Sequence, residues 1–108
     1  MDLISVTQEI HRASKRLGMS ADALFKLGRE KAEAERDYRR ELSKEMLKLK
    51  ADGMPATLIP DVAKGNVSEH LFKRDFSEAQ FKAGIEAADA IKTQVSALQT
   101  ILKYQSDM

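Results

Sequence analysis

Two long stretches of helical periodicity, at about residues 21–52 and 68–105, most constrain how this chain can fold. Their side-chain sizes are complementary when one stretch is read backwards from a turn near residue 60. The expected pairs are Leu49 with Phe72, Met46 with Phe76, Leu42 with Ala79, Tyr38 with Ala83, Ala34 with Ala87 or Ala88, Leu27 with Val95, and Leu24 with Leu98. Protein interiors pack as densely as organic crystals, so large side chains must meet small ones where helices approach closely. The pattern predicts an antiparallel helical hairpin.

The composition agrees with a thin apolar seam. The chain has 108 residues, which predicts a single domain spanning 1–108. Charged residues make up 32% of it, and it has six aromatic residues and no Trp. Helices laid side by side suit this shortage of bulky residues, because each needs to bury only one apolar stripe.

The first residues predict an additional N-terminal helix at about 3–17. One apolar stripe recurs in steps of three and four at Leu3, Val6, Ile10, Ala13 and Leu17. Gly18 follows two basic residues, Lys15 and Arg16, which is typical of a helix C-terminus. Ser20 could then cap the next helix, because its hydroxyl can accept a free backbone N–H. We therefore expect a corner at Gly18.

The connector of residues 53–66 holds both prolines and several apolar residues. We expect it to form an ordered cap over the open end of the hairpin, with a short helix at about Pro60 to Lys64 ended by Gly65. Pro60 suits a first helical turn, where its missing N–H costs nothing. Ser68 is the expected cap of the last helix. The apolar face of that helix then follows a heptad at Gly84, Ala88, Ile91, Val95, Leu98 and Leu102.

The sequence offers little for catalysis. It has no Cys, and its two histidines, His11 and His70, lie at no metal-ligand spacing from each other or from a carboxylate. It also lacks a glycine-rich turn that could cradle a phosphate. We therefore expect a protein that is not an enzyme and has no cofactor or metal. The residues after Asp2 do not resemble a signal peptide, and no apolar run is long enough to cross a membrane, so a soluble cytoplasmic protein is expected.

Basic residues suggest an anion-binding site. Arg36, Arg40, Lys44 and Lys48 recur every four residues, although the net charge of the chain is only +1. The candidate contacts with nucleic acid are Arg36, Arg39, Arg40, Lys44, Lys48, Lys73 and Arg74. Such a patch could neutralise phosphates. The commoner alternative is a solvated helix face whose charges are balanced by neighbouring carboxylates.

A second nucleic-acid signal lies in segment 13–30. Its small residues, its Gly18 at the expected turn, and Leu24 and Leu27 beyond it match the core positions of a helix-turn-helix. Against this, the helix that would read DNA opens with Ala21, Asp22 and Ala23, where basic or amide side chains are expected. An ordinary helix–Gly–helix corner explains the same pattern.

Four apolar residues fall off the main stripes: Phe25, Phe81, Ile85 and Ile101. On an isolated hairpin they could form a second, exposed apolar strip, and exposed strips of this kind mark partner surfaces. We expect a homodimer that forms a larger helical bundle.

Three segments together resemble a group of small helical proteins encoded by tailed bacteriophages and prophages of Gram-positive bacteria. The segments are AEAERDYRREL, MPATLIPDVAKGN and AQFKAGIEAADAIKTQVSALQTILKYQ. The resemblance implies a phage gene product that works beside replication or recombination proteins, or against a host system. It carries no functional residues over to this chain.

The expected function is therefore a non-enzymatic interaction protein of phage origin that binds a host or phage protein. Direct nucleic-acid binding, through segment 13–30 or the stripe 36–48, is the first alternative. A structural component of a phage particle is the second.

Overall fold

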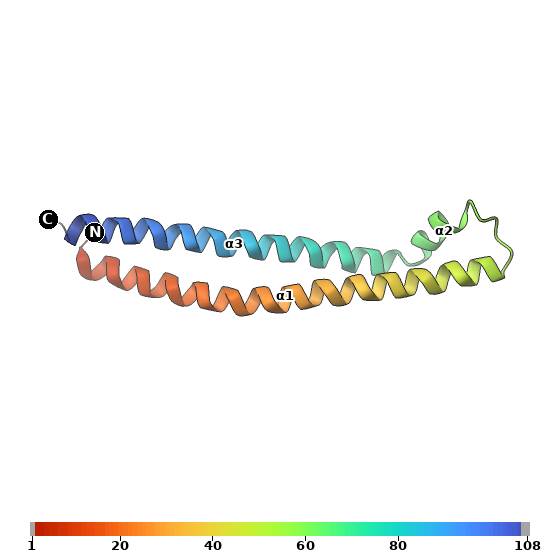
Figure 1. Ribbon diagram of the computed structural model, residues 1–108, viewed down its shortest axis with the longest axis horizontal. Helices are drawn as coiled ribbons and strands as arrows, with labels where there is room; N and C mark the ends of the chain where they lie inside the picture. The colour runs from red at the N-terminus through yellow and green to blue at the C-terminus, as the bar shows by residue number, and fades with distance from the viewer. Residues whose placement is uncertain (1, 107–108) are drawn as a thin grey trace. The chain divides into compact units, whose positions relative to one another are not determined.

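The computed structural model describes residues 2–106 of the chain, the last of them by its backbone only. It has three helices: α1 (Leu3–Ala51), α2 (Ile59–Asn66) and α3 (Ser68–Ser106) (Figure 1). No strand occurs in this part of the chain, so the all-α prediction is confirmed. The chain forms two compact units: unit 1 takes in Met1–Lys26 and Lys82–Met108, and unit 2 takes in Leu27–Phe81.

Asp2 caps the N-terminus of α1. Its carboxylate oxygen accepts a hydrogen bond from the Ser5 backbone N–H at 2.7 Å, and its carbonyl accepts one from the Val6 N–H at 3.0 Å. The first four N–H groups of a helix have no partner within the helix, so an Asp in this position satisfies one of them. The hydrogen bonds from Ser5 lower the pKa of Asp2 below its ordinary value of 3.8.

The expected corner at Gly18 was wrong, and so was the separate helix 3–17, because α1 continues through this residue. The buried or half-buried stripe passes from Leu17 through Ser20 to Leu24 without a change of phase. The hydroxyl of Ser20 donates to the carbonyl of Arg16 at 3.0 Å and therefore does not cap a new helix. Continuous burial of one stripe outweighs the cost of a helical glycine, which is about 1 kcal/mol relative to Ala.

The predicted stop near Gly53 is confirmed. Gly53 has a positive φ of 85°. Its N–H donates to the carbonyl of Lys50 at 3.1 Å, and the N–H of Met54 donates to the carbonyl of Leu49 at 3.1 Å. These two bonds form a Schellman motif, in which a left-handed glycine lets the chain satisfy the last helical carbonyls. Met54 also packs against the cluster that contains Leu49.

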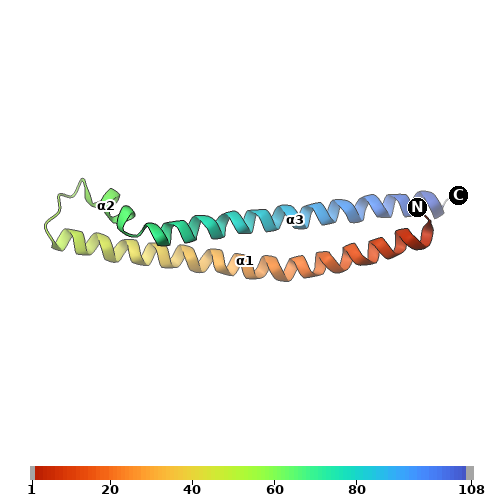
Figure 2. The same cartoon turned by 180° about the vertical axis from the view of Figure 1, so that it is seen from behind.

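Unit 1 pairs the first part of α1 with the last part of α3. The two segments run side by side in opposite directions (Figure 2), and Arg16 donates a hydrogen bond to Gln94 across the pair at 3.4 Å. The buried residues of the seam are Val6, Ala13, Ala88, Ile91 and Leu98. All six positions of the predicted α3 heptad are buried or half-buried, which confirms that face.

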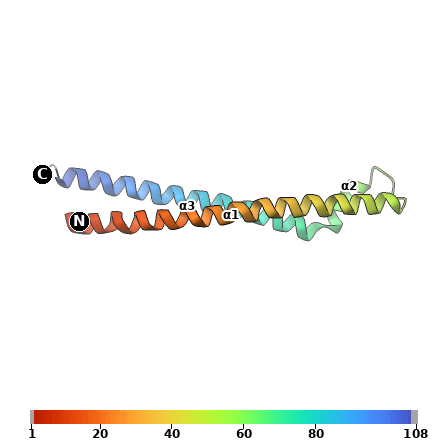
Figure 3. The same cartoon turned by 60° about the horizontal axis from the view of Figure 1, so that its bottom comes forward.

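In unit 2 the chain turns after Gly53 and comes back along α1 (Figure 3). The short helix predicted at Pro60 to Lys64 is confirmed as α2, with Pro60 in its first turn, although it runs through Gly65 to Asn66. Ile59 and Ala63 are buried against Leu49. The connector is therefore ordered and packs over the end of α1, as expected, and its helix α2 forms the first part of the returning arm.

A short junction joins α2 to α3 at Val67, which is buried. Its carbonyl accepts the N–H groups of His70 at 3.0 Å and Leu71 at 3.2 Å, the first bonds of α3. Ser68 is thus the first residue of α3. As the predicted cap, it would have been the residue immediately before the helix.

The predicted register of the hairpin was wrong by about two and a half helical turns at Tyr38. Tyr38 was expected opposite Ala83, but it lies under Arg74. The stripe expected to face α1, made of Phe72, Phe76, Ala79 and Ala83, is exposed along its whole length. Because α2 already covers the end of α1, α3 is left to pair with positions nearer the middle of α1.

Candidate protein-binding surfaces

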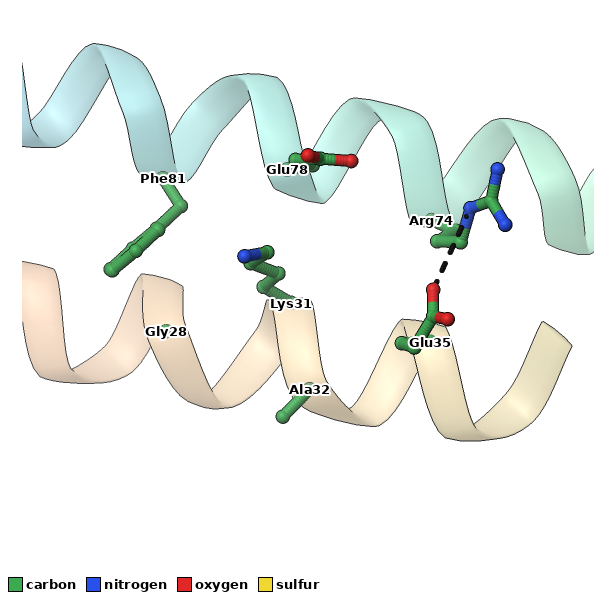
Figure 4. A pocket seen from close by; sticks show the side chains of 7 residues that line it. All are labelled: Gly28, Lys31, Ala32, Glu35, Arg74, Glu78 and Phe81. Carbon is green, nitrogen blue, oxygen red and sulfur yellow. Dashed lines mark ion pairs between the residues drawn. The ribbon is translucent and has the colours of Figure 1, made fainter. Parts of the chain in front are cut away.

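A groove of about 600 Å³ lies between α1 and α3 in unit 2. Figure 4 shows its side chains, which come from both helices. Gly28, Lys31, Ala32, Glu35, Arg74, Glu78 and Phe81 line it. A volume of this size falls in the range of ligand-binding pockets, which are usually more enclosed and more apolar.

One end of the groove is built on a glycine. The ring of Phe81 reaches over Gly28, where a Cβ would come within 3.3 Å of the ring. The Lys31 ammonium lies 5.4 Å from the centroid of the same ring, within reach of a cation–π interaction. Phe81 therefore packs within unit 2 against α1.

Arg74 lies at the other end of the groove. Its guanidinium carbon lies 4.5 Å from the centroid of the Tyr38 ring, and its Nε lies 3.6 Å from Glu35. Nε and Nη2 each donate to one carboxylate oxygen of Asp75 at 3.1 Å. Partial burial acts to lower the pKa of Arg74, but the hydrogen bonds to Asp75 and the charges of Asp75 and Glu35 more than offset it. The net effect is a raised pKa.

The groove is therefore an electrostatically balanced surface. It presents two basic and two acidic side chains, and the cations already have aromatic or acidic neighbours. A small charged ligand would have to displace these contacts, at a cost in desolvation and lost pairing. This arrangement suits a partner surface with mixed charges better than a single anion.

A smaller groove of about 210 Å³ lies on the other flank of the same helix pair, and Glu30, Glu33, Ala34, Asp37, His70 and Lys73 line it. It includes acidic residues that alternate with basic ones along α1. Within residues 2–106, no group of three or more His, Cys, Asp or Glu side chains is placed to hold a metal ion.

The basic stripe is exposed, and most of its charges are paired within α1. Arg39 bonds Glu35 at 2.6 Å, Arg36 and Arg40 share Asp37 at 3.1 and 3.3 Å, and Lys44 lies 3.4 Å from Glu41. Lys48 is exposed, and no ion pair joins it to any other residue of the described chain. Lys73 and Arg74 point to opposite flanks, since they line different grooves.

Segment 13–30 does not form the helix-turn-helix geometry expected as an alternative. All of it lies within α1, because the chain makes no turn at Gly18. A helix-turn-helix needs two helices at a steep angle so that the second can enter the major groove. The match at the core positions reflected the regular burial of Ala13, Leu17 and Leu24 along one helix.

Two residues of the expected second apolar strip, Ile85 and Ile101, do not share one face of α3. Ile85 and Ile101 are sixteen positions apart on α3, which puts them about 160° apart around the helix. Phe81 packs over Gly28. Phe25 is 78% exposed, the highest value among the large apolar residues of the described chain. A partner role for these residues stays a prediction.

The sequence argument missed a pair of exposed rings on α3, formed by Phe72 and Phe76 and called here the ring pair. The two rings stack with centroids 5.9 Å apart and an interplanar angle of 10°. Phe72 is 64% exposed and Phe76 is 53% exposed. Their spacing of four residues put them on one face, but the incorrect register placed that face inside the hairpin. Leu47 and Leu58 are also exposed in unit 2.

None of the helices in the described chain combines the length and apolar character needed to cross a membrane. No family model, no curated protein and no solved structure matches this chain.

Proposed function

We propose that this protein is a non-enzymatic interaction protein whose exposed apolar side chains bind other proteins. One observation carries the proposal: in the described chain eleven large apolar side chains are exposed, whereas ten hydrophobic residues are buried, three of them alanines. Single exposed apolar residues are common on soluble proteins, but larger gatherings mark sites of interaction.

The construction of each unit supports this proposal. In both units the long helices bury one seam, and a helix pair has no second layer to cover its outer faces. The ring pair, Leu47 and Phe25 all lie outside the seams. Fully burying a Leu or Phe side chain is worth about 1.5–3 kcal/mol, so a few such residues can anchor a partner.

The proposed partner is a host or phage protein, on the ground of the resemblance to small phage-encoded helical proteins. The test is an affinity pull-down of the tagged full chain from a bacterial lysate, run with and without nuclease. We expect a discrete protein that survives nuclease treatment. We expect a chain carrying Phe25→Ser, Leu47→Ser and Leu58→Ser to lose it, because these changes remove exposed apolar side chains without touching a seam.

Gln80→Ser is the matched control, since it changes an exposed polar residue on α3. It should retain the captured protein. Equal capture by the triple variant and the control would overturn the assignment of these apolar residues as the binding surface.

A second candidate function is nucleic-acid binding through the basic stripe. The exposure of Arg36, Arg40, Lys44 and Lys48 on one helix favours it. If this stripe binds DNA, affinity should fall steeply with salt, because phosphate neutralisation releases counterions. Arg36→Glu, Arg40→Glu and Lys44→Glu together should then abolish binding. Unchanged affinity in that variant would exclude the stripe as the contact.

A further inference from the structure

The outer face of α3 around the ring pair has the features of a self-association surface. Phe72 and Phe76 lie on the side of the helix opposite Arg74 and Ser77, which face α1. Stacking against each other leaves more than half of each ring open to solvent. These rings are the largest apolar side chains exposed in unit 2, so their burial would dominate any association through this face.

Two charges of opposite sign border the ring pair on one flank. Glu69 and Lys73 are both exposed and lie four residues apart, with the acid nearer the N-terminus, the better orientation for an ion pair within a helix. Even so, no ion pair joins either of them to another residue of the described chain. Lys73 also borders the smaller groove near Glu30 and Asp37, but it pairs with neither.

On the other flank, Asp75 and Ser68 border the same rings. Asp75 accepts hydrogen bonds from Arg74 through one carboxylate oxygen. The other oxygen retains lone pairs that could accept a hydrogen bond from a hydroxyl. A carboxylate and a hydroxyl are therefore available on this flank, and an acid and a base on the opposite one.

We propose that this face binds the same face of a second copy of the chain, with the two α3 helices antiparallel. A two-fold interface must be self-complementary, since each residue i that meets j is matched by j meeting i. If Phe72 lies near the axis, Glu69 comes opposite Lys73 of the second copy, and the reverse pair forms by symmetry. Ser68 comes opposite Asp75 of the second copy, and Phe76 packs over the small Ser68 side chain.

In this single register, the polar side chains on both flanks of the ring pair find partners on the second copy. The inference rests on the proposed function, because it takes the exposed apolar side chains to be protein-binding surfaces. It assigns the ring pair to a second copy and leaves the other exposed residues to a foreign partner.

The area available predicts a weak dimer. An aromatic side chain buries about 150–250 Å² when fully covered, so four half-exposed rings supply roughly 400–500 Å². A stable interface of standard size buries about 1,600 Å² in total. The rings would thus supply about a quarter to a third of a standard interface, and association should depend strongly on concentration.

The first test is sedimentation equilibrium of the purified full chain over a range of concentrations. We expect a reversible monomer–dimer equilibrium. The pair Phe72→Ser and Phe76→Ser should raise the dimer dissociation constant by at least about tenfold, as truncation of central anchors does. Phe25→Ser is the control, because it removes a ring from unit 1 that is more exposed than either ring of the pair, and it should leave the constant unchanged.

A chain that stays monomeric at every concentration would overturn the inference. A dimer that the ring-pair variant leaves intact would overturn it too, whether or not Phe25→Ser dissociates that dimer. Because only purified protein is used, these results are independent of whether a lysate contains a foreign partner. Circular dichroism checks that each variant keeps its helix content.

The second test uses the flanking charges. Glu69→Lys and Lys73→Glu should each weaken self-association, because each puts like charges opposite one another across the two-fold. Mixed together, the two variants should form more heterodimer than random mixing gives, since the lysine introduced in one chain then meets the glutamate introduced in the other. The chain with both changes should regain self-association. A random distribution in the mixture would exclude the proposed register.

Discussion

The guanidinium of Arg74 lies over the ring of Tyr38, 4.5 Å from its centroid, in the seam of unit 2. Tyr38 is only 5% exposed, whereas the head of Arg74 also reaches Glu35 and Asp75. An arginine can bury its aliphatic stem and its flat face while keeping its charge paired. This contact explains how a stretch of α1 with few large apolar residues still forms a packed seam.

Replacing Arg74 by Ala should lower the free energy of unfolding by about 1–2 kcal/mol, because it removes a partly desolvated cation–π contact and uncovers the Tyr38 ring. Urea unfolding followed by circular dichroism would measure the change. Arg36→Ala is the control, since Arg36 pairs only with its neighbour Asp37 on the surface. It should cost less than about 0.5 kcal/mol. Equal effects of the two changes would contradict a structural role for the stack.

Gly18→Ala should stabilise the chain by about 0.5–1 kcal/mol. Gly18 lies inside α1, and a Cβ added there would have no atom within 4 Å. Alanine therefore gains helix propensity without a steric cost. A rise in the thermal midpoint would support the continuous helix, whereas a clear loss of stability would indicate a corner at this residue.

Gly53→Ala should instead destabilise the chain. Gly53 adopts a φ of 85°, and left-handed backbone costs an L-residue about 1–2 kcal/mol. The space around it is open, so any loss of stability must come from the backbone and not from a clash. The same unfolding experiment on both glycine variants makes each the control of the other. An unchanged midpoint for Gly53→Ala would exclude the Schellman geometry at the end of α1.

The cap at Asp2 should make the start of α1 sensitive to pH. Because the folded-state pKa of Asp2 is lowered, its stabilising contribution is present above the ordinary value of 3.8 and is lost as the pH falls through the lowered pKa. Asp2→Asn retains a capping oxygen that does not titrate. The difference in helix content between the two chains should thus be constant near neutral pH and shrink in acid. A difference that does not vary with pH would contradict the carboxylate cap.

Much of the helical structure was predictable from local patterns. The α3 heptad from Gly84 to Leu102, the stop at Gly53 and the short helix after Pro60 all appeared where expected. The continuity of α1 was also predictable from the sequence, since Leu17, Ser20 and Leu24 keep the spacing of the stripe across Gly18. The corner was predicted wrongly because a local glycine signal was preferred to a periodicity that extends over the whole helix.

The register was not predictable in the same way. The first part of α3 carries two stripes that could face α1, one with Phe72 and Phe76 and one with Arg74 and Ser77. Matching large with small side chains favoured the first stripe, which has the larger apolar residues. The second faces inward because α2 occupies the end of α1 and because Arg74 can stack on Tyr38.

The candidate surfaces depend on that register. The exposure of the basic stripe and of Phe25 could be expected from one helix at a time. The groove around Gly28 and Phe81 needs the correct pairing of two helices, and so does the exposure of the ring pair.

The sequence by itself determined that the chain is helical, which residues form the stripes of each helix, and where the turn after α1 lies. These properties follow from spacing, capping and glycine conformation within a few neighbouring residues. Only the tertiary structure decided which of two stripes on α3 faces α1, and therefore which aromatic side chains are left on the surface. That choice depends on competition between packings of residues far apart in the chain, where a partly buried Arg74–Tyr38 stack and a folded-back α2 outweigh the apolar content of a single stripe.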